Sequence, residues 1–266
     1  MKSFGYISLF LITSFSFPLH AGDDDPCSVR NSAFLSGESI TYKVFYSVAS
    51  VYFGAGDAVF SVNEEELNRK PVYHILGTGK TNSLLDNGFR VRDKYESYID
   101  TATLQPYKFV RDVSEGSYKI YEHISFNKTA GTAVTNAGVY NVPSCIQDVL
   151  SAIFYARNID FSKYRPDDKI PFSIFLDNKV YDLYIRSLGK ETIKTRYGKF
   201  RAIKFKPLLI EGTIFSGGEK MVVWVSDDAN HMPLRVESPI IVGKISADMM
   251  SYHNPRYPLT SLISIR

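Results

Sequence analysis

The stretch VYDLYIRSLGKETIKTRYGKFRAIKFKP, Val180 to Pro207, alternates apolar and polar residues in short runs that are separated by glycine and charged residues. In its last run, AIKFKP, Ile203 and Phe205 alternate with lysines. Because successive side chains of a strand point to opposite faces, this pattern is typical of a strand with one face in a core and one in water. The short links between the runs predict antiparallel neighbours.

Similar runs fill the chain from Glu38 onward, and YKVFYSVASVYFGAGDAVFSV, Tyr42 to Val62, is another example. They are rich in Tyr, Phe, Val, Ile and Thr and are broken by Gly, Asn and Asp. The full chain is 44% hydrophobic and 14% aromatic, enough to bury a substantial core. We therefore predict a mainly β protein: one domain over 38–266 with a large curved antiparallel sheet, a half-barrel or an open barrel.

One segment, PSCIQDVLSAIFYARNID, breaks the β pattern. Ser144 and Gln147 have the spacing of a capping box. Apolar residues then recur at helical spacing: Ile146, Val149, Leu150, Ile153 and Phe154. The pattern predicts an amphipathic helix over 144–158, packed on the concave side of the sheet with its stripe towards the core or a ligand groove. This helix would link two halves, roughly 38–143 and 160–255.

Each half contains a hairpin with Asp and Pro at equivalent positions. In KYESYIDTATLQPYKFVRD a β run ends at Asp100 and Pro106 follows, and in KMVVWVSDDANHMPLRVES the equivalent residues are Asp227 and Pro233. Asp is favoured where a chain turns because its side chain bonds the backbone two residues on, and Pro suits the first residue of a returning strand. The pattern predicts an exposed turn in each half and two pseudo-repeated halves.

A metal site formed by Asp227, Asp228 and His231 is the alternative to that turn. Adjacent carboxylates at a strand end point to opposite faces, and the spacing matches no zinc or calcium signature. Gly79–Thr81 resembles part of a phosphate-binding loop but lacks its first glycine, and no serine lies in a G-x-S-x-G elbow. We expect no metal, no cofactor and no catalytic residue that the sequence alone identifies.

The first residues, MKSFGYISLFLITSFSFPLHAGDDD, join a lysine, an apolar run and small residues at Ala21 and Gly22. This pattern predicts a secretory signal peptide over 1–21, followed by an N-terminal extension over 22–37. Pro18 interrupts the apolar run before it reaches membrane-spanning length, and no later segment comes close. We expect a periplasmic or extracellular protein that does not span the membrane.

Removal of that peptide would take away Lys2 and leave 30 basic residues against 28 acidic ones, a net charge of +2. This small excess is not typical of a nucleic-acid-binding protein. We therefore expect no nucleic-acid partner, and we expect a monomer.

Two cysteines, Cys27 and Cys145, lie beyond the predicted signal peptide. An even count in an oxidising compartment favours a disulfide between them. The alternative places Cys145 in the first turn of the predicted helix, where the helix dipole lowers a thiol pKa and would favour a nucleophile. No histidine lies near Cys145 in the sequence to complete that chemistry.

Five segments in order resemble an exported bacterial domain family of unknown function, number 3108, over most of Glu38 to Tyr252. They are GESITYKVFY, YESYIDTATLQPYKF, QDVLSAIFYAR, YGKFRAIKFKP and VWVSDDANHMPLRVES. The family supplies no catalytic residues. The last hairpin is also distantly similar to the periplasmic lipoprotein carriers, in which a half-barrel wraps around helices and holds acyl chains. This chain departs from them by having one evident helix instead of several.

Three functions follow as hypotheses. The first is a non-enzymatic envelope protein that binds a lipid, another apolar or amphipathic small molecule, or an envelope protein on its curved sheet. The second is a hydrolase acting on glycans, with carboxylates brought together by the fold. The third is a purely structural interaction module. Converging carboxylates in a pocket would favour the enzyme, and a wide apolar groove would favour the carrier.

Overall fold

The computed structural model describes the chain except for residues 1–26, 28, 50, 212–215 and 266. The predicted signal peptide, 1–21, and the first residues of the predicted extension lie outside the described residues.

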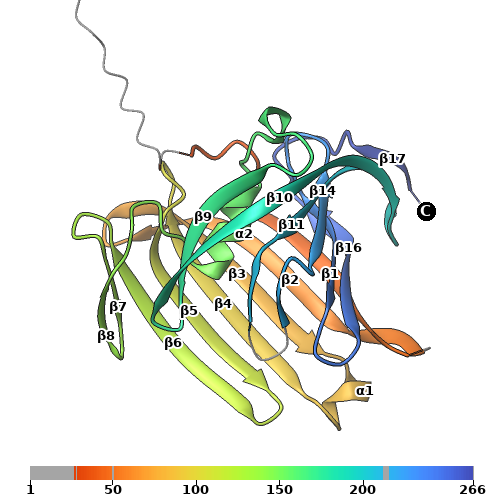
Figure 1. The fold of residues 1–266 in the computed structure, drawn as a ribbon, viewed down its shortest axis with the longest axis horizontal. Helices are drawn as coiled ribbons and strands as arrows, with labels where there is room; N and C mark the ends of the chain where they lie inside the picture. The colour runs from red at the N-terminus through yellow and green to blue at the C-terminus, as the bar shows by residue number, and fades with distance from the viewer. Residues whose placement is uncertain (1–26, 28, 50, 212–215, 266) are drawn as a thin grey trace, which may run out of the picture.

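The described chain forms one large antiparallel sheet of fifteen strands and a small two-stranded sheet, β12 (Leu209–Glu211) with β13 (Ser216–Gly218) (Figure 1). The first half contributes β1 (Glu38–Val48), β2 (Val51–Leu67), β3 (Lys70–Thr81), β4 (Val91–Asp100), β5 (Pro106–Glu115), β6 (Tyr118–Asn127), β7 (Thr132–Thr135) and β8 (Gly138–Asn141). The second half contributes β9 (Lys169–Leu176), β10 (Lys179–Lys194), β11 (Gly198–Pro207), β14 (Val222–Ser226), β15 (Pro233–Pro239), β16 (Lys244–His253) and β17 (Leu262–Ile265). The predicted mainly β fold class is confirmed.

The strand order shows how the two halves join. It runs β8-β7-β6-β5-β4-β3-β2-β1-β16-β15-β14-β11-β10-β9, and β17 pairs with β11. The halves therefore meet where β1 pairs with β16. The sheet curls until its two ends come near each other (Figure 1). Within the described residues β8 and β9 form no backbone ladder, and side chains join these ends instead.

The two ends of the sheet differ in what covers them. The turns after β2, β4, β6 and β14 lie at one end, called here the upper end, together with the segment that follows β8. The turns after β1, β3, β5, β9 and β15 lie at the lower end, where the short helix α1 (Ser83–Asp86) is also found (Figure 1).

The main helix, α2 (Val149–Ala156), is shorter than predicted and begins later. Cys145 has a φ of 63°, which a helix does not accept, and Gln147 exchanges two backbone hydrogen bonds with β9, from its N to the Ser173 oxygen and from the Phe175 N to its own oxygen. The predicted start at 144 is therefore wrong. The helix is capped by Asp148, which forms a capping box with Ser151.

Helix α2 packs against the inner face of β3 and β4 and against β9, and a short 3-10 helix, η1 (Phe161–Lys163), follows it. Leu150 and Phe154 enter a core cluster with side chains of β2 to β7 and β9. Tyr155 and Ala156 contact a second cluster on β9, β10, β11 and β14. The helix therefore joins the two halves on the concave side of the sheet.

Arg157, the C-cap residue of α2, ties the helix to the rest of the upper end. Its guanidinium group is 2% exposed and binds both carboxylate oxygens of Glu38, the carbonyl oxygen of Ala33 and that of Asn230. Because a buried charge is costly unless it is paired and fully hydrogen-bonded, this set of partners fixes the helix end against β1 and the β14–β15 turn.

The two predicted hairpins share one irregularity. After a register shift Pro106 pairs with Ile99, and after an equivalent shift Pro233 pairs with Val225. Each proline thus opens its strand beside a bulge, a position that tolerates a missing N–H donor. The turns themselves are confirmed, and the repetition of the bulge supports two pseudo-repeated halves.

The second turn is less exposed than predicted. Asp228, and not Asp227, bonds the backbone two residues on, at the Asn230 N, and it also accepts from the Ser226 hydroxyl and the Ser261 N. Asn230 is fully buried, and its side-chain amide donates to the Tyr257 oxygen and accepts from the Tyr257 N. The C-terminal segment covers this turn, an arrangement that the local pattern does not contain.

Candidate functional site

Burial decreases along the inner face of β4 and β6 towards the lower end. Ser97 of β4 donates to Asp148 at 2.6 Å, which identifies the face of β4 that carries α2. On that face Ile99 and Ser97 are fully buried, whereas Tyr95 and Asp93 are only partly buried. On β6 the side chains likewise change from fully buried Ile124 to 41%-exposed Tyr118. The lower inner wall is therefore partly open to solvent along β4 and β6, whereas Val113 of β5 between them is 4% exposed.

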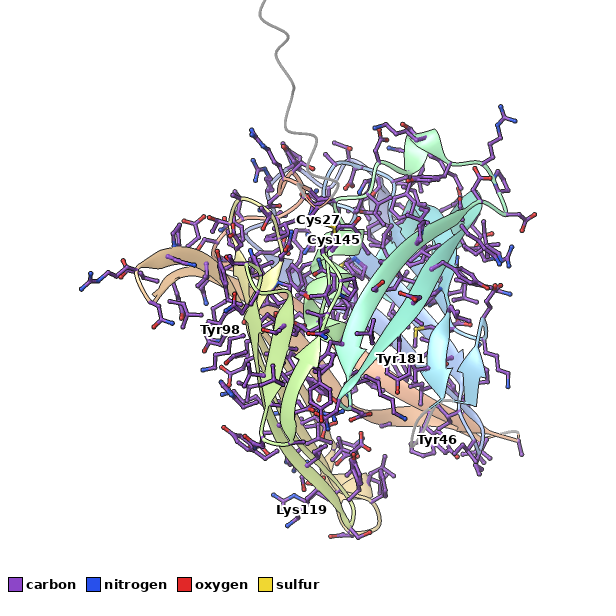
Figure 2. The ribbon with its side chains drawn as sticks, turned by 60° about the vertical axis from the view of Figure 1, so that its left-hand side comes forward. Cys27, Tyr46, Tyr98, Lys119, Cys145 and Tyr181 are labelled. Carbon is purple, nitrogen blue, oxygen red and sulfur yellow. A yellow bond between two sulfur atoms is a disulfide. The ribbon has the colours of Figure 1, made fainter. Side chains whose placement is uncertain are left out.

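Figure 2 helps to orient the two ends. Cys27 and Cys145 mark the upper end, Lys119 marks the tip of the β5–β6 hairpin at the lower end, and Tyr181 lies on the second half facing the viewer. The inner face of the sheet extends between the upper end and the lower end.

Two carboxyl groups share the lower inner wall, Asp93 of β4 and Glu115 of β5. Burial raises the pKa of Asp93. Burial also raises the pKa of Glu115, and the charge of Asp93 and a hydrogen bond between the two side chains raise it further. Two neighbouring carboxylates cannot both ionise freely, so the pair holds a proton at a higher pH than either group would alone.

Arg111 lies next to this pair, because it stands opposite Tyr95 in the β4–β5 ladder and two residues from Val113, the partner of Asp93. It is 8% exposed and bonds Asp177 in the turn between β9 and β10. Its Nε lies 2.8 Å from Glu122 of β6, although the angle between them is not that of a hydrogen bond. The guanidinium thus joins β5 to β6 and to the far end of the sheet.

The second half presents a more apolar wall. Ile170 and Ile185 pair with each other and pack against the segment that follows α2. The next pair on the same face, Phe172 with Leu183, is partly exposed, as is Tyr181. Carboxyl and guanidinium groups on one wall and aliphatic and aromatic side chains on the other suit an amphipathic molecule.

Each side chain of the predicted helical stripe has a place in the structure. Leu150 and Phe154 are buried, and Val149 packs on the core from its edge. Ile146 is 6% exposed but precedes the helix, and Ile153 is 40% exposed. Two members of the stripe thus lie in the first core cluster as part of the helix.

Cys27 and Cys145 are joined by a disulfide, with their Cα atoms 4.9 Å apart. The bond ties the described N-terminal segment to the loop before α2. A bonded thiol does not titrate, so the alternative of a nucleophilic Cys145 does not apply to this state.

The geometry gives little support to hydrolysis. Retaining glycosidases separate their carboxyl groups by about 5–5.5 Å and inverting ones by more, whereas Asp93 and Glu115 lie so near each other that the charge of Asp93 raises the pKa of Glu115. Among the described residues no group of three or more His, Cys, Asp or Glu side chains is placed to hold a metal ion. Hydrogen bonding and charge pairing with a ligand are the chemistry that this wall offers.

A cavity of about 520 Å³ lies against β2 to β5, lined mostly by residues that alternate with those of the inner wall and also by Asp93. Charged side chains line much of it, including Asp57, Lys80, Arg92 and Lys94. Several of these are already paired, Asp57 with Lys43, Arg92 with Asp86 and Lys94 with Glu96. These pairs account for part of its charge.

Comparison with known proteins places the fold and the family. The model of the family described as "Protein of unknown function (DUF3108)" matches residues 41–250, which confirms the resemblance seen in the sequence. Among curated proteins, none matches this sequence. Within the described residues no helix is long and apolar enough to cross a membrane.

Solved structures share the architecture at low sequence identity. A crystal structure of a β-barrel-like protein of the domain of unknown function DUF1849, from Brucella abortus, has a TM-score of 0.57 and 9% identity over 85% of this chain and 100% of that chain. A candidate lipoprotein from Parabacteroides distasonis has a TM-score of 0.39 and 14% identity, with 84% of this chain and 100% of that chain covered. The first of these supports the barrel-like fold and nothing beyond it.

Proposed function

The chain belongs to the DUF3108 family, and on that premise we propose that it is an exported, non-enzymatic protein of the cell envelope that binds an amphipathic ligand on the inner face of its curved sheet. The ligand would enter at the lower end. Its polar part would meet Asp93, Glu115 and Tyr118, and its apolar part would meet Phe172 and Leu183.

The observation that carries this proposal is the decrease in burial along the inner strands. In the upper half the wall is filled by α2 and by fully buried side chains such as Ile99 and Ile124. In the lower half Tyr95, Asp93 and Tyr118 on the same face are partly or largely exposed, although Val113 of β5 stays 4% exposed. An incompletely filled concave surface with a few polar groups is the usual form of a small-molecule site.

The Cys27–Cys145 disulfide supports export, since such bonds persist in oxidising compartments. The predicted signal peptide points the same way. A purely structural module remains the second candidate, favoured by the fully buried packing of Phe154 against Phe34 in the upper half.

Titration with N-phenyl-1-naphthylamine, an apolar dye that fluoresces when it leaves water, tests the proposal. We expect saturable binding that Leu183→Arg weakens by about tenfold or more, because the charge would lie on the apolar wall. Asp182→Arg is the matched control, since Asp182 is exposed and alternates to the other face of β10. Equal effects of the two variants, with both folded, would contradict an inner site.

A further inference from the structure

Three neighbouring turns at the lower end carry large apolar side chains into solvent. Ile241 and Val242 lie in the β15–β16 turn, Val51 and Tyr52 follow the β1–β2 turn, and Leu84 and Phe89 lie between β3 and β4. Their exposed fractions range from 50% for Phe89 to 74% for Leu84. These six residues are called here the tip row. A cluster of this kind on a folded protein usually marks an interaction surface.

The tip row is continuous because its strands are neighbours. Ser47 pairs with Lys244, which joins the first turn to the second. The Tyr46 hydroxyl also donates to the Val242 oxygen at 2.9 Å. Between the second turn and the third, the Asn82 N donates to the Ala55 oxygen at 3.0 Å. The apolar side chains therefore project from braced turns.

Polar interactions hold Leu84 in its exposed position. It lies in α1, whose N-cap is Asn82. Asp86 of the same helix accepts from Arg92 and from the Thr81 hydroxyl. This network fixes a one-turn helix and leaves its leucine in water, although burial of a leucine is worth about 1.5–3 kcal/mol. The exposure of the Leu84 side chain is explained if the surface of another molecule covers it.

The charge of the three turns indicates what that surface is. Segments 47–56, 81–92 and 237–244 contain three basic residues, Arg90, Arg92 and Lys244, and two acidic residues, Asp86 and Glu237, which pair with Arg92 and Lys244 and leave a net charge of +1. A second copy of the row would carry the same charge and be repelled, whereas an anionic lipid surface would attract it. Aromatic residues such as Tyr52 and Phe89 also suit the membrane interface.

We propose that the tip row docks on an anionic lipid bilayer, inserting its apolar side chains between head groups while Arg90 faces the phosphates. This inference does not depend on what the inner wall binds. It concerns the surface of the turns, and its test uses vesicles and no ligand.

Vesicle flotation of the disulfide-bonded protein is the test. We expect binding to vesicles of 30% phosphatidylglycerol in phosphatidylcholine that weakens as salt is raised, and much weaker binding to pure phosphatidylcholine. The variant Val51→Gln, Leu84→Gln, Val242→Gln should lower the bound fraction by about tenfold or more, because partitioning follows the inserted apolar area. The control Ile263→Gln, Ile265→Gln changes exposed residues of β17, 49% and 71% exposed, and should bind as the parent does.

Several results would overturn the proposal: no vesicle binding, equal binding to both vesicle types, or equal losses in the two variants. Sedimentation velocity without vesicles tests the alternative, in which a second copy of the chain binds the tip row. A dimer that the tip-row variant abolishes, with no vesicle binding by the parent, would assign the row to a second copy of the chain.

Discussion

Arg111 of β5 bonds Asp177 in the β9–β10 turn, across 66 residues of sequence, and so connects the two ends of a sheet whose outermost strands share no described backbone ladder. Thr135 and Asn178 form a second link at 2.8 Å. The barrel-like shape is therefore closed by side chains at its lower end, beside the proposed ligand site.

Removing Arg111 should destabilise the protein more than removing its exposed partner. Arg111→Met leaves Glu122, whose side chain is 12% exposed, without its cation, and we expect a loss of about 3 kcal/mol in the free energy of unfolding. Asp177→Asn should cost no more than about 1 kcal/mol, because Asp177 is 56% exposed. Urea unfolding compares them. Equal losses would show that the turn, and not the buried pair, provides the stability.

Only the buried side of α2 should contribute to the free energy of unfolding. Phe154→Ala opens a cavity beside Phe34, whose ring lies 5.0 Å away, and should cost roughly 3–5 kcal/mol. Ile153→Ala, one residue earlier and 40% exposed, should cost less than about 1 kcal/mol. Thermal and urea unfolding give both values. A small loss for Phe154→Ala would mean that α2 does not pack in the core as described.

Asp148 should make stability depend on pH. Burial raises its pKa to about 6, although hydrogen bonds from Ser97 and from the first turn of α2 oppose the shift. Because the folded pKa lies above the unfolded value of about 3.9, the folded state binds the extra proton between these values, and this contribution is present at low pH and lost as pH rises through 6.

The contribution amounts to at most about 3 kcal/mol. Asp148→Asn keeps the cap but removes the titration. The difference in unfolding free energy between parent and variant, measured from pH 4 to pH 7, should therefore shift in favour of the variant as pH rises. A pH-independent difference would show that Asp148 ionises normally.

The disulfide should stabilise the fold chiefly by constraining the unfolded chain. It spans 118 residues, and the chain-entropy account gives up to about 5 kcal/mol for a loop of that size. Cys27→Ser with Cys145→Ser should lower the unfolding free energy by that amount or less, and reductant should then have no further effect. Intact mass after alkylation, with and without reduction, verifies the bond in the parent. Two alkylated thiols in unreduced, unfolded protein would exclude it.

The strands could be predicted from the sequence, because the alternation of apolar and polar side chains within a strand depends only on residues that are neighbours in the sequence. Lys204 and Ile203 alternate as a half-buried strand requires, and Pro106 and Pro233 mark the two hairpin turns. The start of α2 was misplaced because Ser144 and Gln147 imitate a capping box, while the bonds of Gln147 to β9 come from tertiary structure. A local sequence pattern carries no information about the edge of β9 with which Gln147 pairs.

The site residues could not be predicted from the sequence for a similar reason. Asp93 and Glu115 lie 22 residues apart and look like ordinary polar members of alternating strands. Only the pairing of β4 with β5 brings them together, and only the packing of the whole sheet leaves them partly exposed. The one local signal was the inner row of β4, which changes from apolar at Ile99 to charged at Asp93.

Native mass spectrometry of the protein isolated from its own host tests the central claim most directly. If the inner wall binds an amphipathic molecule, the folded protein should carry an additional mass of one small amphiphile, which denaturation releases and which Leu183→Arg reduces while Asp182→Arg does not. Parent protein that is folded, disulfide-bonded and free of any added mass, and that also fails to bind N-phenyl-1-naphthylamine, would contradict the account and favour a structural module.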